Sequence, residues 1–204
     1  MSRFLSLLCC LSVLVAFVPC FAHANEKQAR AYIDSLAEQT LQIIKTDVEK
    51  DTKKTQLKSL FARNVDIKWV GKFVMGRYWR KATQEQQTRY LNEYEQFILG
   101  HYAERFTEYT SGDYNITGYE NSGDGEYLVS MEMINPGKPN EAPVLVDYRV
   151  RQNGNNFMVF DVIIEGVSMI TTQRSEFASV ISRNGIDYLI DQLANKTMKI
   201  SASQ

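Results

Sequence analysis

The segment from Phe157 to Glu165 constrains the fold most, because it is apolar on both faces of a predicted strand. Side chains of a strand alternate between its two faces. One face then carries Phe157, Val159 and Ile163, and the other carries Met158, Phe160, Val162 and Ile164. A strand with water on one side would alternate apolar and polar residues. This segment therefore needs apolar cover on both sides, either from packed helices or from an apolar cavity.

A second strand precedes this one and completes a hairpin. Between Val144 and Arg151 apolar and polar residues alternate, with Val146, Tyr148 and Val150 sharing one face. The intervening residues 152–156 read Gln-Asn-Gly-Asn-Asn, which is turn chemistry, and Gly154 can take a positive φ. We therefore expect a long antiparallel hairpin over residues 144–165.

The remaining segments predict helices on either side of a small sheet. We expect helices over residues 25–48, 83–109, 174–183 and 186–193, and a further helix that begins at a cap at Asp51. A capping box at Thr83 and Gln86 marks the start of the helix over 83–109. Strands are expected at 114–120 and 126–134. This order predicts an α+β fold: a curved antiparallel sheet of about four strands with helices packed on it, enclosing an apolar cavity.

The first 24 residues have the pattern of a secretory signal. Arg3 precedes an apolar run from Phe4 to Phe21, and Ala22-His23-Ala24 is a small-x-small cleavage site. We expect cleavage after Ala24, which leaves residues 25–204 as a single domain. The three cysteines lie at positions 9, 10 and 20, so the mature chain would have no cysteine and one histidine, His101.

Composition removes several classes of function. A chain with no cysteine and one histidine offers no thiolate zinc site and no set of histidine ligands, so no metal and no resident cofactor is expected. The formal net charge is −1, which lacks the strongly basic balance typical of nucleic-acid binding and also argues against simple electrostatic docking on an anionic membrane surface. No glycine-rich phosphate loop precedes a predicted helix. Lys68, Lys72, Arg77 and Arg80 are expected at the surface, either simply solvated or in contact with a headgroup or a partner.

The hairpin and the residues after it resemble the MlaC (Ttg2-type, toluene tolerance) family of periplasmic phospholipid-binding proteins. That family carries a tyrosine-arginine strand, a strand ending in Tyr-Asp-Val, a Glu-Gly-Val-Ser turn and an Arg-x-x-Phe helix start. The corresponding residues are Tyr148-Arg149, Phe160-Asp161-Val162, Glu165-Gly166-Val167-Ser168, and Arg174 with Phe177. Phe157 and Phe160 stand where the family usually has Trp and Tyr, and both keep an aromatic ring.

The resemblance implies a periplasmic carrier that holds a phospholipid by its acyl tails and belongs to a system that maintains the lipid asymmetry of the outer membrane. Its implied partners are an outer-membrane lipoprotein–porin complex and an inner-membrane ABC transporter complex with its substrate-binding subunit. The residues expected to line the lipid site, chosen by face and by closeness to the family segment, are Phe73, Phe97, Phe106, Tyr148, Val150, Phe160, Val162, Ile164, Val167 and Met169.

The residues also permit a rival function, that of a periplasmic enzyme acting on a small hydrophobic substrate. Asp161 lies in an apolar strand, and a buried carboxyl group facing His101 would supply an acid and a base. Arg149 and Arg151 are close by in the hairpin, and a buried aspartate paired with an arginine is the more common arrangement. Ser168 has no Gly-x-Ser-x-Gly context, so a serine hydrolase is not indicated.

Overall fold

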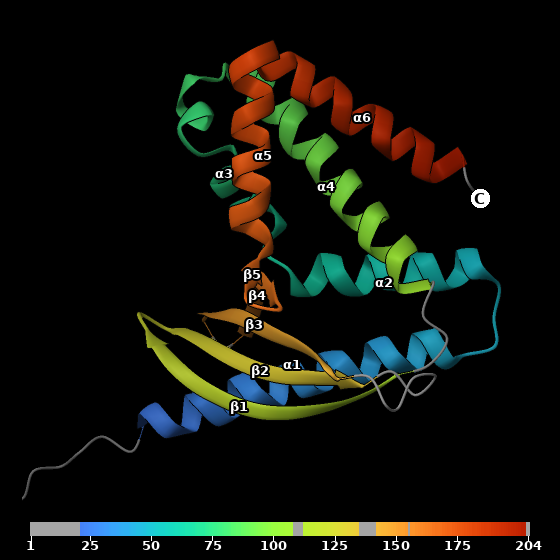
Figure 1. Ribbon diagram of the computed structural model, residues 1–204, viewed down its shortest axis with the longest axis vertical. Helices are drawn as coiled ribbons and strands as arrows, with labels where there is room; N and C mark the ends of the chain where they lie inside the picture. Colours follow the sequence, from blue (N-terminus) through green and yellow to red (C-terminus); the bar gives the residue numbers. More distant parts are fainter. Residues whose placement is uncertain (1–20, 108–111, 135–141, 155, 203–204) are drawn as a thin grey trace, which may run out of the picture.

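The strands follow one another across the sheet in chain order, forming an antiparallel meander (Figure 1). They are β1 (Asp113–Gly123), β2 (Glu126–Ile134), β3 (Val144–Asn153), β4 (Asn156–Ile164) and β5 (Val167–Ser168). The structure is a computed structural model that describes residues 21–107, 112–134, 142–154 and 156–202. The predicted α+β fold is confirmed, with the two-residue β5 as an additional strand.

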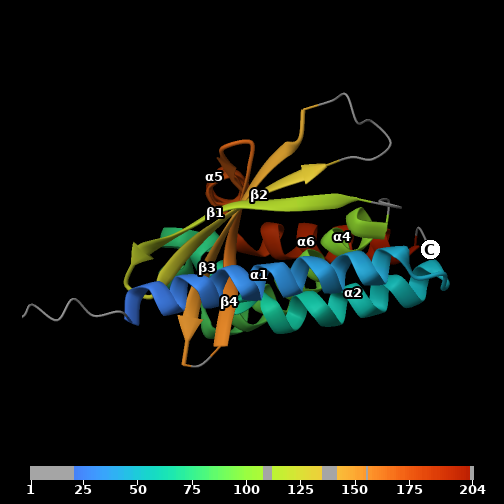
Figure 2. The ribbon, with the colours of Figure 1, turned by 90° about the horizontal axis from the view of Figure 1, so that it is seen from below.

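Helices lie before and after the sheet in the chain. They are α1 (Phe21–Lys45), α2 (Lys50–Asn64), α3 (Ile67–Met75), the 3-10 helix η1 (Gly76–Lys81), α4 (Gln84–Thr107), α5 (Met169–Asn184) and α6 (Ile186–Ala202). α1 crosses the sheet and lies beside α2, as Figures 1 and 2 both show. Seen from below, in Figure 2, the sheet is strongly twisted. α5 rises from the end of the sheet and leads into α6, which returns alongside α4.

Local sequence signals account for several of the element boundaries. The capping box forms as predicted: the Thr83 backbone N–H donates to Gln86 Oε1 (3.1 Å), and the Gln86 N–H donates to Thr83 Oγ1 (3.2 Å). Gly154 turns the β3–β4 hairpin at φ 61°, and Gly185 ends α5 at φ 89°. The predicted cap at Asp51 is wrong, because α2 begins at Lys50 and its N-cap Glu49 makes no side-chain capping bond.

A β-bulge in β4 changes which side chains share a face. Arg149 of β3 pairs with Asp161, whereas the next residue, Val150, pairs with Val159, so Phe160 is the extra residue. One extra residue reverses the alternation beyond it. Phe160 therefore packs among the helices, whereas Val162 packs on the other side with Val159. The predicted common face for Phe160 and Val162 is wrong for this reason.

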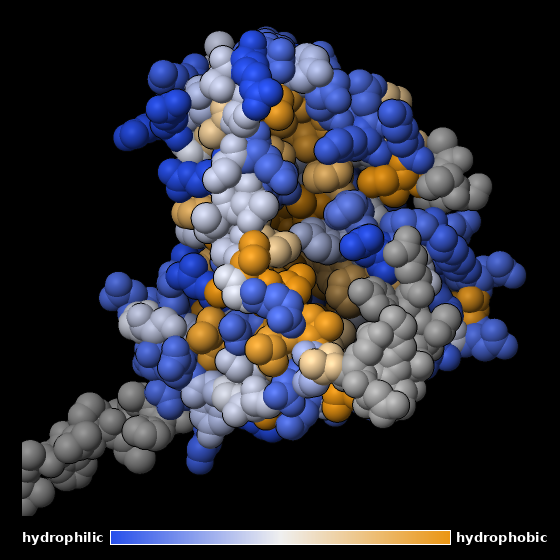
Figure 3. All heavy atoms as spheres, in the orientation of Figure 1, coloured by the Kyte–Doolittle hydropathy of each residue, from blue (hydrophilic) through white to orange (hydrophobic). Residues whose placement is uncertain are grey.

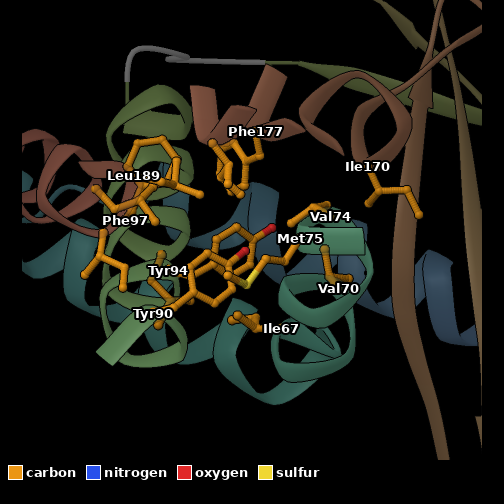
Figure 4. Packing of buried hydrophobic residues seen from close by; sticks show 14 of the residues in the cluster. Ile67, Val70, Val74, Met75, Tyr90, Tyr94, Phe97, Ile170, Phe177 and Leu189 are labelled. Atoms are coloured by element: carbon orange, nitrogen blue, oxygen red, sulfur yellow. The ribbon is translucent and has the colours of Figure 1, made fainter. Parts of the chain in front are cut away.

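The buried apolar residues form two clusters. The helical cluster joins α3, α4, α5 and α6, and Figure 4 shows Tyr90 and Tyr94 of α4 with Phe177 of α5 at its centre. The two tyrosine rings stack at 5.6 Å between centroids, and each meets the ring of Phe177 edge-on. The sheet cluster packs α1 on β2, β3 and β4, and its members are Ala29, Ile33, Tyr127, Val129, Met131, Val150, Phe157 and Val159. α1 thus covers one face of the sheet, and the sheet also borders the space between the two clusters.

Candidate functional site

An apolar cavity lies between the helical cluster and the sheet cluster. Its empty space is about 1370 Å³, part of which is open to solvent. Figure 3 shows this face of the molecule hollowed between the helices and the sheet, with apolar residues in and below the hollow. A space of this size and lining is typical of a site for a hydrophobic small molecule.

Six parts of the fold supply the walls. α1 contributes Ile33, Leu36, Leu41 and Ile44; α2 contributes Phe61; α3 contributes Ile67 and Val70; α4 contributes Tyr94, Ile98, Tyr102 and Phe106; the sheet contributes Met131, Met133, Tyr148, Val159, Phe160 and Val162; α5 contributes Met169 and Ile170. Residues of both clusters are in this list, such as Ile33 from the sheet cluster and Val70 from the helical cluster. The cavity is therefore a gap between two packed regions.

Most polar groups at the cavity are occupied by bonds within the protein. The Thr40 hydroxyl donates to the Leu36 carbonyl at 2.8 Å, and the Tyr94 hydroxyl donates to Gln173 Oε1 at 2.6 Å. The Tyr114 hydroxyl donates to Asp34 Oδ1 at 2.8 Å. A cavity whose polar groups are already bonded internally offers a ligand mainly apolar contact.

Two tyrosines at the cavity have hydroxyl groups in a poorly hydrated environment. Desolvation raises the pKa of Tyr148 to about 12. It also raises the pKa of Tyr102, and the negative charge of Asp161 raises it further, while Arg105 lowers it. Both side chains are therefore neutral at physiological pH. They can donate or accept a hydrogen bond but contribute no charge to the site.

Asp161 is the one buried acid at the cavity, at 2% exposure, and its carboxylate is held by three groups. Ser168 Oγ donates to Oδ2 at 2.7 Å, and the Ile170 backbone N–H donates to Oδ1 at 3.2 Å. Arg149 Nη1 lies 3.8 Å from Oδ2. The expected pairing of Asp161 with an arginine is confirmed, and the bond to the first turn of α5 adds a favourable interaction with the helix dipole. Asp161 thus anchors α5 to β4.

The structure does not bring together the acid and base of the rival enzyme. His101 is exposed on α4, stacks on Phe97 at 5.6 Å between ring centroids, and is not among the residues that line the cavity. Asp161 is occupied by the three interactions above. The geometry therefore does not favour acid–base chemistry by this pair.

Five of the ten residues predicted for the lipid site line this cavity. They are Phe106, Tyr148, Phe160, Val162 and Met169. They come from α4, β3, β4 and the first residue of α5, so the fold collects them from distant parts of the chain.

The other five lie outside the cavity lining. Phe73 stacks on Trp69 at 5.1 Å and lies under the guanidinium of Arg174. Phe97 belongs to the helical cluster and Val150 to the sheet cluster. Ile164 and Val167 pair with each other at the end of the sheet, where they are 37% and 52% exposed. Packing within the two clusters accounts for Phe73, Phe97 and Val150, and a position at the end of the sheet accounts for Ile164 and Val167. Neither can be read from the spacing of apolar residues.

The wall formed by α1 was missed by sequence reasoning. Leu36, Leu41 and Ile44 line the cavity, together with Phe61 from α2. Their signal in the sequence was the apolar stripe of an amphipathic helix, which indicates a buried face but not what that face covers.

Within residues 21–107, 112–134, 142–154 and 156–202, no group of three or more His, Cys, Asp or Glu is placed to hold a metal ion. Among the helices in these ranges, none combines the length and the apolar character that a membrane crossing requires.

Comparison with known proteins places the chain in a family. A family model described as MlaC protein matches residues 34–195, which is most of the chain and includes α2 to α5 in full. The chain belongs to the MlaC family. The resemblance carried by the β3–β4 hairpin is thereby confirmed.

Named relatives agree with this assignment to the MlaC family. The chain is 25% identical over 143 residues to the intermembrane phospholipid transport system binding protein MlaC of Haemophilus influenzae, covering 69% of this chain and 64% of the relative. It is 30% identical over 138 residues to the toluene tolerance protein ttg2D of Pseudomonas putida, covering 66% of this chain and 63% of the relative. The chain thus spans somewhat under two thirds of the length of these two relatives.

A solved structure shares the fold. It is the phospholipid-binding protein of Ralstonia solanacearum, determined in complex with a phospholipid, with a TM-score of 0.72 and 24% sequence identity. The match covers 85% of this chain and 98% of the other. At this level of identity the match supports the α+β architecture of the MlaC family chain and not the details of its site.

Proposed function

We propose that this MlaC family chain is a phospholipid carrier that holds the acyl tails of its cargo in the cavity between the two clusters. The observation that carries the proposal is the lining of that cavity, which is mainly apolar and has most of its polar groups bonded internally. Two similar proteins support the same function: one relative is a phospholipid transport system binding protein, and the solved structure is a phospholipid-binding protein in complex with a phospholipid.

The energetics of a carrier fit a site without chemistry. A lipid with two tails of about 16 carbons has about 30 methylene groups, and hiding them from water is worth about 24 kcal/mol at ~0.8 kcal/mol each. A bilayer hides the same groups, so the cavity must nearly match the bilayer without greatly exceeding it. Apolar walls alone supply this balance. A nucleophile or a metal would add nothing to it.

The proposed contacts of the tails are the five predicted residues that line the cavity, together with the α1 wall. Phe106, Phe160 and Met169 offer flexible or flat apolar surface, and Tyr148 and Val162 face each other across the β3–β4 ladder. Loading would require the helical cluster and the sheet cluster to separate, because the cavity lies between them.

The place of action follows from the same proposal. Residues 1–24 would direct the chain to the periplasm and be removed after Ala24. There the carrier would exchange lipid with an outer-membrane lipoprotein–porin complex and an inner-membrane ABC transporter complex with its substrate-binding subunit, and so maintain outer-membrane lipid asymmetry.

Native mass spectrometry of protein purified from the periplasm tests the proposal directly. The expected result is added mass that extracts into organic solvent as intact diacyl glycerophospholipid, on a chain that begins at Asn25. A mass without cargo, together with no uptake of labelled lipid from vesicles, would refute the carrier function. Bound lipid attached to peptide would indicate a carrier of lipoproteins instead.

A pair of matched substitutions localises the lipid. Val162→Trp places a large ring in the cavity, whereas Val144→Trp makes the same change at an exposed position of the neighbouring strand. We expect Val162→Trp to lower the lipid bound per protein severalfold and Val144→Trp to leave it unchanged, with both variants folded by circular dichroism. Equal lipid content in the two variants would place the cargo elsewhere.

A further inference from the structure

Six cations gather on one side of the helical region. They are Lys68 and Lys72 of α3, Arg77, Arg80 and Lys81 of η1, and Arg174 of α5, and all six are exposed. We call this set the basic face. No acidic residue occurs from position 67 to position 84. Figure 1 places α3 and η1 at the upper left, and the same region of Figure 3 is strongly hydrophilic.

The basic face lacks the acidic partners that other cations of this chain have. Arg149 and Arg151 both pair with Glu126, and Arg89 pairs with Asp187 and Asp191. Across the described ranges, none of the six cations of the basic face lies within 4.0 Å of a carboxylate. The chain has a formal net charge of −1, so the rest of the chain carries −7. The molecule is therefore strongly polarised in charge.

Aromatic rings beneath the basic face hold four of its cations in place. Lys72 lies over Trp79 at 5.6 Å, and Arg174 lies over Phe73 at 4.8 Å. Arg77 and Lys81 lie over the same ring, that of Tyr78, at 5.1 and 5.9 Å. These rings are half-buried and pack against the helical cluster. Cations supported in this way lose less conformational freedom when they bind an anion.

The basic face lies close to one wall of the cavity. Ile67 and Val70 of α3 line the cavity. Lys68 and Lys72, four residues apart on the same helix, are exposed to solvent. One helix, about 10 Å in diameter, thus separates bound tails from whatever the basic face touches. A surface that docked here would lie within reach of the cargo site.

We propose that the basic face docks this protein on an anionic phospholipid surface. The inference builds on the proposed carrier function, because a carrier must approach lipid headgroups to load and to deliver. A lipid surface fits better than an acidic protein, because the rings under the basic face are covered by cations and do not form an open apolar pocket for a partner's anchor residue. A cluster of four to eight Lys and Arg is the usual signature of anionic lipid binding. The charge of −7 elsewhere would orient the molecule with the basic face toward the membrane.

Vesicle co-sedimentation tests the docking. The mature protein is mixed with vesicles of phosphatidylcholine alone, or of phosphatidylcholine with an equal amount of phosphatidylglycerol. We expect binding to the anionic vesicles only, and we expect it to weaken as salt is added. Absence of binding to the anionic vesicles at low salt would overturn the proposal.

A matched pair of double variants assigns the docking to the basic face. Lys68→Gln with Arg80→Gln removes two of its charges, and Lys27→Gln with Lys199→Gln removes two exposed charges from α1 and α6. Each charge of the basic face is expected to contribute about fivefold, so the first variant should bind about 25-fold more weakly. The second should bind as the wild type does. Equal weakening in both variants would refute a localised docking face.

The lipid content of the same variants separates this inference from the carrier function. If docking is the role of the basic face, Lys68→Gln with Arg80→Gln slows lipid transfer between anionic vesicles, while the lipid bound on purification stays unchanged. Loss of bound lipid in this variant would mean that the basic face belongs to the cargo site, which contradicts docking. Unchanged vesicle binding with slower transfer to a membrane-protein acceptor would assign the basic face to an acidic protein and refute the lipid surface.

Discussion

Replacing Asp161 by asparagine removes one charge from the most tightly held polar group of the cavity wall. The carboxylate accepts hydrogen bonds from Ser168 Oγ and from the Ile170 N–H, and it faces Arg149 at 3.8 Å. An amide keeps the shape but has only one acceptor oxygen, so one hydrogen bond becomes neutral and the other meets an NH2 group that cannot accept it, which costs about 1 kcal/mol for each. The Arg149 side chain is 39% exposed, so its loss of a partner adds at most about 0.5 kcal/mol. We expect a total loss of about 2 kcal/mol in the free energy of unfolding.

Urea denaturation of delipidated protein measures this loss, and a thermal melt should show a fall of about 4–8 °C in Tm for a chain of this size. Asp147→Asn is the control, because it makes the same change on β3 at a side chain with no hydrogen bond or ion pair among the described residues. A loss below about 0.5 kcal/mol for Asp161→Asn, the range of ordinary surface changes, would refute the anchoring role. Bound lipid should persist in the folded variant, whereas a general acid or base would lose about 100-fold in rate.

Two more changes test the packing and the ionisation of the cavity walls. Gly71→Ala should destabilise the protein by about 1 kcal/mol or more in urea denaturation, because the new Cβ would lie 2.9 Å from Tyr94 Cδ1. Gly100→Ala should instead stabilise α4, because the atom nearest to its new Cβ lies 3.6 Å away. Equal effects of the two changes would contradict this reasoning. Between pH 10 and pH 12 the folded state keeps the Tyr148 proton that the unfolded state has lost, so the free energy of unfolding should fall by up to about 1.4 kcal/mol per pH unit. Tyr148→Phe should reduce that slope, and an unchanged slope would exclude the desolvated hydroxyl as its cause.

The sequence predicted the parts of this fold that depend on neighbouring residues. The β3–β4 hairpin was predictable because alternation and Gly154 act locally, and the start of α4 because Thr83 and Gln86 bond to each other's backbone. The residues of the family motif also led to Tyr148, Phe160 and Val162, which the structure places around the cavity.

The rest of the site depends on tertiary packing that a pattern does not encode. The bulge at Phe160 is fixed by pairing with β3, and it separates side chains that strict alternation would place together. Phe97 and Phe106 are both aromatic residues of α4, yet one packs in the helical cluster and the other lines the cavity. The α1 wall was invisible for the same reason, since an apolar stripe does not say whether it meets a sheet or a ligand.

The sheet is inserted between the two halves of the helical cluster. α3 and α4 come before it in the chain and α5 and α6 after it, so Thr107 and Met169 are 62 positions apart. Each strand of the meander pairs with its sequence neighbour, whereas the helical cluster requires the closure of one long loop. Contacts of high sequence separation form slowly, while hairpins form within microseconds. Once the sheet has formed, it shortens the loop that joins the two helical halves, so we expect the helical cluster to close after the hairpins have paired.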